Sequence, residues 1–304
     1  MAGQGAARGE AVGLIGLGAM GMGMAQSLRR AGCTVHVCDK RADVAKAFAA
    51  EGGTAHADPA GVAARCGVLV SVVVNAAQTE EVLFGAGGAA AAMRPGSVFV
   101  MCSTVDPNWS SRLEARLAEK GILYLDAPIS GGAARAASGE ITMMTAGADA
   151  AYALCEPILK SISARFYKLG AKAGAGSKVK IINQLLAGVH IAAAAEAMAL
   201  GLREGVDPRD LYEVISNSAG NSWMFSNRMP HVLDADYTPL SAVDIFVKDL
   251  GLVLDTARAS KFPLPLASTA HQMFMQASSA GHGGEDDAAV IKIFPGIELP
   301  SKPE

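Results

Sequence analysis

The amino-acid sequence predicts an α/β amino-terminal domain with a mostly parallel sheet, followed by an all-α domain that begins with a long interdomain helix. The length of 304 residues suits two domains of about 150 residues each. The first half alternates short β-branched runs with Ala-rich helical stretches, whereas the second half shows helical periodicity alone. We expect a disordered tail at 1–10 and domains at 11–173 and 174–298.

Seven short runs in the first half are expected to be strands. Each is rich in β-branched residues and is bounded by Gly, Pro, Asp or Ser. They cover 11–16, 34–39, 68–74, 97–103, 122–128, 141–147 and 164–170. Near-continuous apolar strands with helices between them are typical of a parallel sheet that is covered on both faces.

The second half carries only helix signals. A long helix is expected from about 178 to 203, and the break between the two halves falls near 172–177. Pro208 stands where the first turn of a further helix would begin, and Gly220 stands where a helix would end.

Composition excludes several classes of function. With 51% hydrophobic residues, 18% charged residues and a net charge of −3, the chain is globular and shows no basic surface for nucleic acid or membrane. Five cysteines without C-x-x-C spacing argue against a disulfide framework or a metal site. The most apolar helix, around 185–202, contains His190 and Glu196 and is too short for a clean membrane span. We therefore expect a cytoplasmic protein.

The first expected strand runs into the pattern G-x-G-x-x-G. Its glycines allow a tight turn and a close approach of the backbone to a pyrophosphate, and the following helix presents free N–H groups to the phosphates. Asp39 ends the second strand 23 residues after the first glycine, near the expected offset of about 20. The pattern therefore predicts a Rossmann-type dinucleotide site rather than a turn that serves packing alone. The loop residues assigned to the cofactor are Gly16, Leu17, Gly18, Ala19, Met20 and Gly21.

The acid at the end of the second strand predicts NAD as the cofactor. Asp39 would accept hydrogen bonds from the adenosine ribose hydroxyls and repel a 2′-phosphate. Lys40 and Arg41 follow directly and could hold a 2′-phosphate, so NADP stays open.

Polar side chains crowd the start of the long helix. Lys180, Asn183 and Gln184 are spaced i, i+3, i+4 and share one face. A lysine at a helix amino terminus, with a second cation such as Lys248 nearby, is suited to act as a base because both positive charges lower its pKa. The alternative is an ordinary surface lysine, which spacing alone would favour.

Four ordered segments resemble the signature segments of the β-hydroxyacid dehydrogenase family, which includes 3-hydroxyisobutyrate dehydrogenase. They are GLGAMGMGMA, DAPISGGAARAASGEITMM, GAGSKVKIINQ and FVKDLGL, within a resemblance that covers about 11–295. The pattern G-x-G-x-x-x-K-x-x-N begins at Gly174. The resemblance implies that Lys180 is the catalytic acid/base and that Asn183 positions the substrate.

The same resemblance implies roles for other residues. It assigns Ser130, Gly131 and Gly132 to the substrate carboxylate. It assigns Ser103, Thr104 and Lys248 to the neighbourhood of the cofactor.

Within the family, three segments look most like the branch that oxidises the four-carbon sugar acid L-threonate. They are VVVNAAQTEEVLFG, NQLLAGVHIAAAAEAMALG and YTPLSAVDIFVKDLGLV. Gln184 replaces a second Asn that is frequent in the family, and Asn75, expected near the cofactor, stands where many relatives have Leu-Pro. His190 lies seven residues after Asn183 and could reach a polyol hydroxyl, or it could be a core histidine.

Two other readings remain. The substrate could be 3-hydroxyisobutyrate or tartronate semialdehyde, or the chain could bind a dinucleotide without catalysis. The apolar faces of the helical half, together with the resemblance, predict a homodimer or homotetramer.

Overall fold

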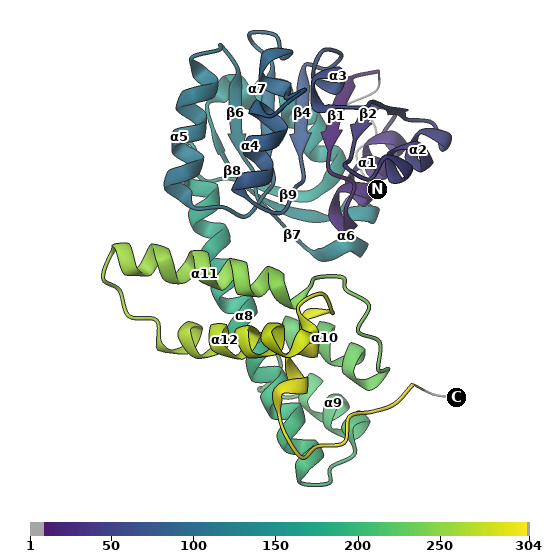
Figure 1. Ribbon diagram of the computed structural model, residues 1–304, viewed down its shortest axis with the longest axis vertical. Coiled ribbons are helices and arrows are strands. Elements are labelled where there is room, and N and C mark those ends of the chain that lie inside the picture. Colours follow the sequence, from purple (N-terminus) through teal and green to yellow (C-terminus); the bar gives the residue numbers. More distant parts are fainter. Residues whose placement is uncertain (1–8, 303–304) are drawn as a thin grey trace. The chain divides into compact units, whose positions relative to one another are not determined.

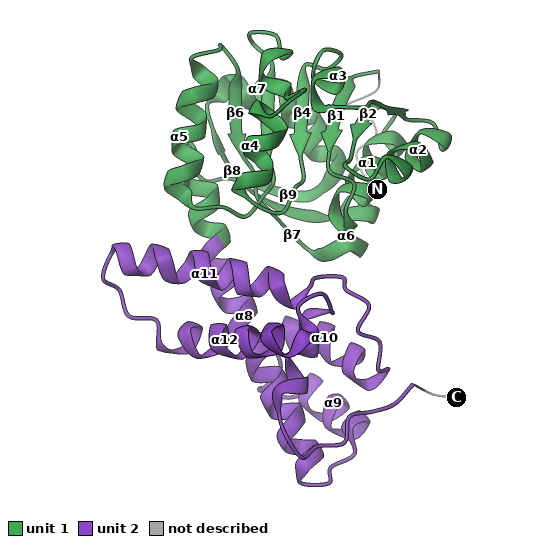
Figure 2. Cartoon of the chain, in the orientation of Figure 1, with its two compact units in different colours: residues 1–180 green, residues 181–304 purple. Residues whose placement is uncertain are grey.

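The computed structural model describes residues 9–302, so the predicted tail at 1–10 lies outside the described residues apart from Gly9 and Glu10. Figure 1 shows an α/β region followed by a helical region, which confirms the predicted fold class. The chain forms two compact units, residues 1–180 and 181–304 (Figure 2). Helix α8 (Ala175–Arg203) begins in unit 1 and continues in unit 2.

Unit 1 contains a sheet in the order β3-β2-β1-β4-β5-β6-β8-β7, with β9 paired to β8. The pairs among the first six strands are parallel, whereas β8 runs antiparallel to β6 and β7. The seven predicted runs are all strands. The strands are β1 (Ala11–Ile15), β2 (Thr34–Cys38), β3 (Thr54–Ala55), β4 (Val68–Ser71), β5 (Val98–Met101), β6 (Leu123–Asp126), β7 (Ile129–Ser130), β8 (Ile141–Gly147) and β9 (Ser163–Lys168).

Helices connect these strands and supply the two outer layers of unit 1. They are α1 (Ala19–Arg30), α2 (Ala42–Ala50), α3 (Pro59–Ala63), α4 (Ala76–Phe84), the short 3-10 turn η1 (Ala89–Ala91), α5 (Pro107–Ala118), α6 (Gly132–Ser138) and α7 (Asp149–Ile162). Side chains alternate along each strand. Val68 and Val70 of β4 therefore join one apolar core, and Leu69 joins the other.

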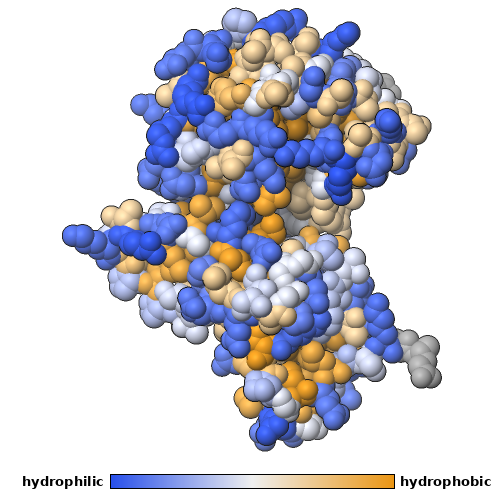
Figure 3. Space-filling model, viewed as in Figure 1, coloured by the Kyte–Doolittle hydropathy of each residue, from blue (hydrophilic) through white to orange (hydrophobic). Residues whose placement is uncertain are grey.

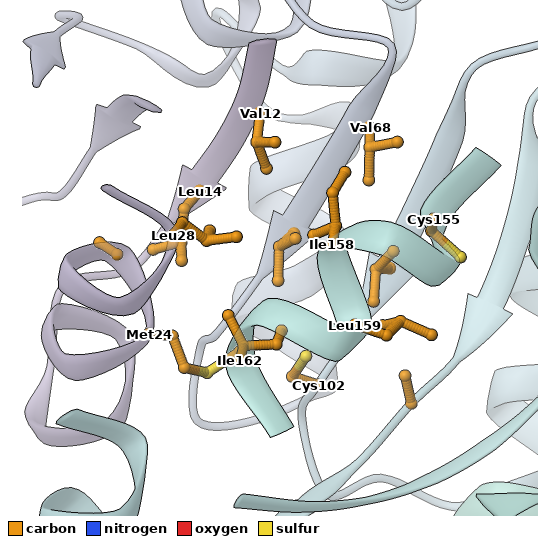
Figure 4. Close-up of a cluster of buried hydrophobic side chains, with 14 of the residues drawn as sticks. Val12, Leu14, Met24, Leu28, Val68, Cys102, Cys155, Ile158, Leu159 and Ile162 are labelled. Carbon is orange, nitrogen blue, oxygen red and sulfur yellow. The ribbon is translucent and has the colours of Figure 1, made fainter. Parts of the chain in front are cut away.

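The two cores of unit 1 lie on opposite faces of the sheet. In Figure 4, side chains of α1 (Met24, Leu28) and α7 (Ile158, Ile162) gather against β1 and β4. On the other face, buried residues of α3, α4 and α5 pack against the remaining strand side chains. Burial on both faces explains why the strands have near-continuous apolar sequences.

Unit 2 is helical in the part of the chain that the structure describes. Besides the remainder of α8 it holds α9 (Pro208–Ser216), α10 (Trp223–Leu233), α11 (Val243–Ala259), α12 (Pro265–Ala277), the π-type turn η2 (Ser278–His282) and the 3-10 turn η3 (Asp287–Ile293). Its core includes Ile191 and Met198 of α8, Phe246 of α11 and Phe274 of α12. The two phenylalanine rings stack with centroids 5.1 Å apart.

Helix α8 is longer than the apolar segment predicted at 185–202. By length and composition it could cross a membrane, in contrast to the sequence-based expectation, but half of its most apolar 18-residue window is buried within the chain. The core helix of a soluble protein can have the same length and apolar composition. The predicted domains at 11–173 and 174–298 divide the chain where α8 starts and remain a proposal, because the two compact units divide within that helix.

Candidate active site

The turn from β1 into α1 has the close backbone contacts that the glycine pattern requires. Gly16 has φ +94°, and a Cβ on it would lie 2.4 Å from the Val72 carbonyl oxygen. A Cβ on Gly21 would lie 1.8 Å from the Gly16 carbonyl oxygen, so a side chain cannot be accommodated there. Gly18, by contrast, faces open space. The first and third glycines therefore serve packing, and the second leaves room for a ligand.

Helix α1 presents its amino terminus at this open position. Gly18 is the residue that caps it, and having no side chain it makes no side-chain cap hydrogen bond. The uncapped N–H groups and the positive end of the helix dipole suit a phosphate group. The carboxyl ends of β1, β4 and β5 meet at the same edge because these strands are parallel neighbours.

Asp39 follows β2 and is tied to the glycine loop. Its Oδ2 accepts a hydrogen bond of 2.6 Å from Leu17 N, and its Oδ1 accepts bonds from Arg41 N and Nε at 2.8 and 3.3 Å. Burial raises the pKa of Asp39, but these hydrogen bonds and the Arg41 charge outweigh it and hold that pKa below its usual value. An ionised carboxylate retains lone pairs for ribose hydroxyls.

The two cations that kept NADP open are both paired with carboxylates. Arg41 bonds Asp39 and donates to the Leu17 carbonyl oxygen at 3.2 Å. Lys40 Nζ lies 2.7 Å from Glu81 Oε2, and both side chains are exposed. The side chains of both cations are more than half exposed, so these pairs are weak and leave either cation able to reach a 2′-phosphate.

The residues expected near the nicotinamide follow β4 and β5. Ser103 is buried, and its Oγ donates to the Val73 carbonyl oxygen at 2.7 Å. Asn75 caps α4 by accepting a bond of 2.9 Å from Gln78 N. Its side chain therefore has a structural role that the sequence did not predict, and a cofactor contact remains a prediction. Thr104 is partly buried beside Ser103.

The segment expected to hold the substrate carboxylate turns sharply between β7 and α6. Ser130 is partly exposed at the end of β7. Gly131 and Gly132 follow with φ values of +135° and +78°, a region that favours glycine. These positive φ values explain why two glycines occur together here.

The second turn of α8 carries Lys180, which is only 7% exposed. Lys178 on the same helix is exposed. Lys180 is therefore not an ordinary surface lysine, because it is buried whereas Lys178 is exposed. Glu196 is exposed, as its position on the opposite face predicted.

A second group of polar residues forms a connected chain within unit 2. Asn183 Nδ2 donates to Gln184 Oε1 at 3.0 Å, and Gln184 Nε2 donates to Asp249 Oδ2 at 2.6 Å. Lys248 Nζ lies 2.5 Å from the other Asp249 oxygen as a charge contact rather than a directed hydrogen bond. Asp249 is 1% exposed, so this buried carboxylate orients both amides.

His190 stands apart from this group. It is exposed on α8 and shares a helix face with the exposed residues Ile182 and Leu186. This position does not support a buried core histidine, and the substrate contact that was predicted for it remains untested.

Comparison with known proteins agrees with this geometry. Residues 11–170 match the model of the NAD binding domain of 6-phosphogluconate dehydrogenase, and residues 174–294 match that of NADP-dependent 3-hydroxyisobutyrate dehydrogenase. The L-threonate dehydrogenase of Cupriavidus necator is 69% identical over 96% of this chain and 99% of its own length. The L-threonate dehydrogenase of Escherichia coli is 52% identical over 95% of this chain and 96% of its own length.

A solved structure is also closely similar. A Salmonella typhimurium protein described as 3-hydroxyisobutyrate dehydrogenase has a TM-score of 0.90 and 53% identity, over 93% of this chain and 99% of its own. The chain belongs to the 3-hydroxyisobutyrate dehydrogenase-related family of β-hydroxyacid dehydrogenases. It is thus an NAD-dependent oxidoreductase acting on CH–OH groups.

Sequence reasoning missed two carboxylates of this β-hydroxyacid dehydrogenase. Asp249, beside Lys248, and Asp126, within the expected strand at 122–128, were assigned no role. An acid inside an apolar strand, or beside a basic residue in an apolar helix, was the available signal.

Proposed function

We propose that this chain oxidises the C2 hydroxyl of L-threonate to the 2-oxo acid with NAD as the hydride acceptor. The observation that carries the proposal is the 69% identity to an L-threonate dehydrogenase across nearly the full length of both chains. The residues assigned to catalysis support it, because Lys180 and Asn183 stand one helical turn apart on α8.

The glycine turn fits a dinucleotide on structural grounds. Gly18 leaves space beside the uncapped amino terminus of α1, and Asp39 stands where ribose hydroxyls need an acceptor. When bound, NAD supplies the acceptor for the hydride that leaves C2 of the substrate.

Lys180 performs the proton transfer in this proposal. Its neutral amine takes the hydroxyl proton while the C2–H bond breaks, and the protonated amine returns it in the reductive direction. The side chain is almost fully buried, so bulk water competes poorly for that proton. The product carbonyl forms as one hydride and one proton leave the alcohol.

Other residues bind and orient the substrate. Ser130 and the backbone N–H groups of Gly131 and Gly132 hold the carboxylate. The amide of Asn183 is oriented through Gln184 and Asp249, and it positions the reacting hydroxyl.

One alternative substrate has specific support. The Salmonella structure, 53% identical, carries the name 3-hydroxyisobutyrate dehydrogenase, which keeps that substrate open. A non-catalytic dinucleotide-binding role is disfavoured, because Lys180 is present and buried.

The test is initial NAD reduction over L-threonate, D-threonate, L- and D-erythronate, D-glycerate and 3-hydroxyisobutyrate. A clear kcat/KM preference for L-threonate supports the proposal. A preference for 3-hydroxyisobutyrate or glycerate rejects the sugar-acid substrate and keeps the chemistry. No turnover with any of them, while NAD still binds, favours the non-catalytic role.

A lysine pair tests the mechanism. Lys180→Ala should lower kcat by at least about 100-fold because it removes the proton acceptor, while NAD binding stays intact. Lys178→Ala is the matched control, since that lysine is exposed two residues earlier. Normal turnover of Lys180→Ala would exclude the proton-transfer role.

We also propose that the protein is a cytoplasmic homo-oligomer assembled through unit 2. Large apolar side chains are exposed along one face of α8: Ile182 is 59% exposed, Leu186 51% and Leu200 62%. Figure 3 shows an apolar patch around α9 and the later turns of α8. Covering by a second copy would remove these side chains from water.

A further inference from the structure

The start of α8 is held by one buried carboxylate. Asp126, the last residue of β6, is fully buried and accepts three hydrogen bonds. Its Oδ2 accepts from Gly174 N at 2.8 Å and from Ser177 N at 2.9 Å, and its Oδ1 accepts from Ser177 Oγ at 2.7 Å. These donors lie 48 and 51 residues away along the chain, so the contact joins the sheet to the helix.

The backbone at this junction is packed too closely for side chains at its two glycines. A Cβ on Gly176 would lie 2.3 Å from the Met144 carbonyl oxygen, and one on Gly174 would lie 2.7 Å from Ser111 Oγ. Ser111 in turn donates to the Ala173 carbonyl oxygen at 3.0 Å. The helix start is therefore seated against α5, β6 and β8 at once.

Two functional segments meet at Asp126. Ser177 precedes Lys180 by three residues, so the first turn, which Asp126 holds, leads directly into the turn that carries Lys180, on the same face of the helix. Four residues after Asp126, the chain reaches Ser130 and the two glycines with positive φ. All of these residues belong to unit 1.

We propose that Asp126 is a positioning residue that fixes Lys180 relative to the 130–132 loop. It acts through Ser177 and the first turn of α8, and it does not touch the reacting atoms. A purely structural carboxylate would be expected to affect folding and all binding steps alike. Asp126 instead acts on the alignment of one proton-transfer group. The inference rests on the proposed role of Lys180.

The carboxylate also suits this place electrostatically. It lies at the positive end of a 29-residue helix, where a negative charge is stabilised. Burial raises the pKa of Asp126, and the hydrogen bonds from Ser177 and Gly174 oppose that rise. Both of its oxygens act as acceptors, because Gly174 N, Ser177 N and Ser177 Oγ all donate to it.

The test compares Asp126→Ala, Asp126→Asn and Ser177→Ala in the full-length enzyme, with the substrate on which it is most active. We expect Asp126→Ala to lower kcat by about 10- to 100-fold, since a misplacement of about 1 Å has effects of this size. NAD affinity should be unchanged. Asp126→Asn can still accept the two N–H bonds and should restore most of kcat, and Ser177→Ala should fall between the two.

The control is Asp207→Ala, which changes an Asp that caps α9 by accepting bonds from Arg209 N and Asp210 N. It makes the same chemical change at a helix start that carries no assigned catalytic group, so kcat should not change. Thermal unfolding of each variant shows whether it is folded. If Asp126→Ala does not fold, the Asn and Ser177→Ala variants carry the test.

A double variant separates the outcomes. In a Lys180→Ala background, Asp126→Ala should cause no additional loss of residual kcat/KM, because both changes affect one step. If Asp126→Ala causes the same loss in this background as in the wild type, the inference is overturned. Normal kcat in folded Asp126 and Ser177 variants also overturns it, provided that Lys180→Ala is still strongly impaired. Normal turnover of Lys180→Ala instead overturns the proposed function.

Discussion

At the residue scale, two glycines of one motif should respond differently to the same substitution. Gly21→Ala puts a methyl group 1.8 Å from a backbone oxygen and should destabilise the protein by about 1–3 kcal/mol. Gly18→Ala meets open space, at an ordinary φ of −69°, and should leave the melting temperature nearly unchanged. It should still weaken NAD binding, because its methyl group stands where the pyrophosphate approaches.

Calorimetry and NAD titration of the two glycine variants check this expectation. Equal loss of stability in both would show that Gly18 also serves packing. Normal NAD affinity in a folded Gly18→Ala protein would show that the phosphates do not approach this loop.

Asp39 is the residue that should set the choice between NAD and NADP. Asp39→Ala removes the charge that repels a 2′-phosphate and frees Arg41 to bind one. The ratio of kcat/KM for NAD to that for NADP should fall about tenfold or more, which corresponds to about 1.4 kcal/mol. Asp43→Ala, an exposed acid in the first turn of α2, is the control. An unchanged ratio would mean that Asp39 does not read the ribose.

At the scale of elements, the longer strands were predictable from the sequence, whereas two short strands were not. Runs such as 68–74 and 97–103 are apolar because both of their faces are buried, and this pattern is visible in the sequence. Strands β3 and β7 have two residues each, too few for any periodicity. The start of α8 at Ala175 was missed by three residues, since glycines obscure it.

The packing of α10 against η3 depends on a buried ion pair. Arg228 Nε donates to Asp287 Oδ1 at 2.5 Å and Nη2 donates to Oδ2 at 3.1 Å, and Asp287 is fully buried. Arg228→Met should cost about 3–5 kcal/mol, because it leaves a buried carboxylate unpaired. Arg258→Met breaks a pair in which both side chains are mostly exposed, and should cost at most about 1 kcal/mol.

Denaturant unfolding of the two arginine variants measures this difference. Similar free energies of unfolding for both would show that solvent reaches Asp287. They would also show that the Arg228–Asp287 pair does not hold α10 in place.

At the scale of the whole molecule, the sequence predicts candidate site residues but not the contacts between them. The glycine pattern, Asp39 and the lysine helix could be read from spacing, because each depends on local geometry. The Asp126–Ser177 and Gln184–Asp249 bonds join residues 51 and 65 positions apart, and a single sequence carries no signal for such pairs. The helix-capping bond of Asn75 was also not predicted, and its contact with the cofactor stays a prediction.

The exposed apolar face of α8 predicts that copies of the chain assemble through it. Ile182, Leu186 and Leu200 lie within one stripe, since 18 residues make five helical turns. Burial of each such side chain contributes about 1.5–3 kcal/mol, so the double variant Ile182→Glu/Leu186→Glu should raise the dissociation constant of the oligomer at least about 100-fold.

Light scattering over a range of protein concentrations tests this assembly. The control is Leu154→Glu on α7, where the side chain is 49% exposed in unit 1. Monomers from the double variant, with the control still assembled, would support the α8 face as the interface and show whether the wild type is a dimer or a tetramer. A monomeric wild type would exclude self-association, whereas an unchanged double variant would exclude this face, because two added carboxylates cannot remain unpaired in a buried apolar contact.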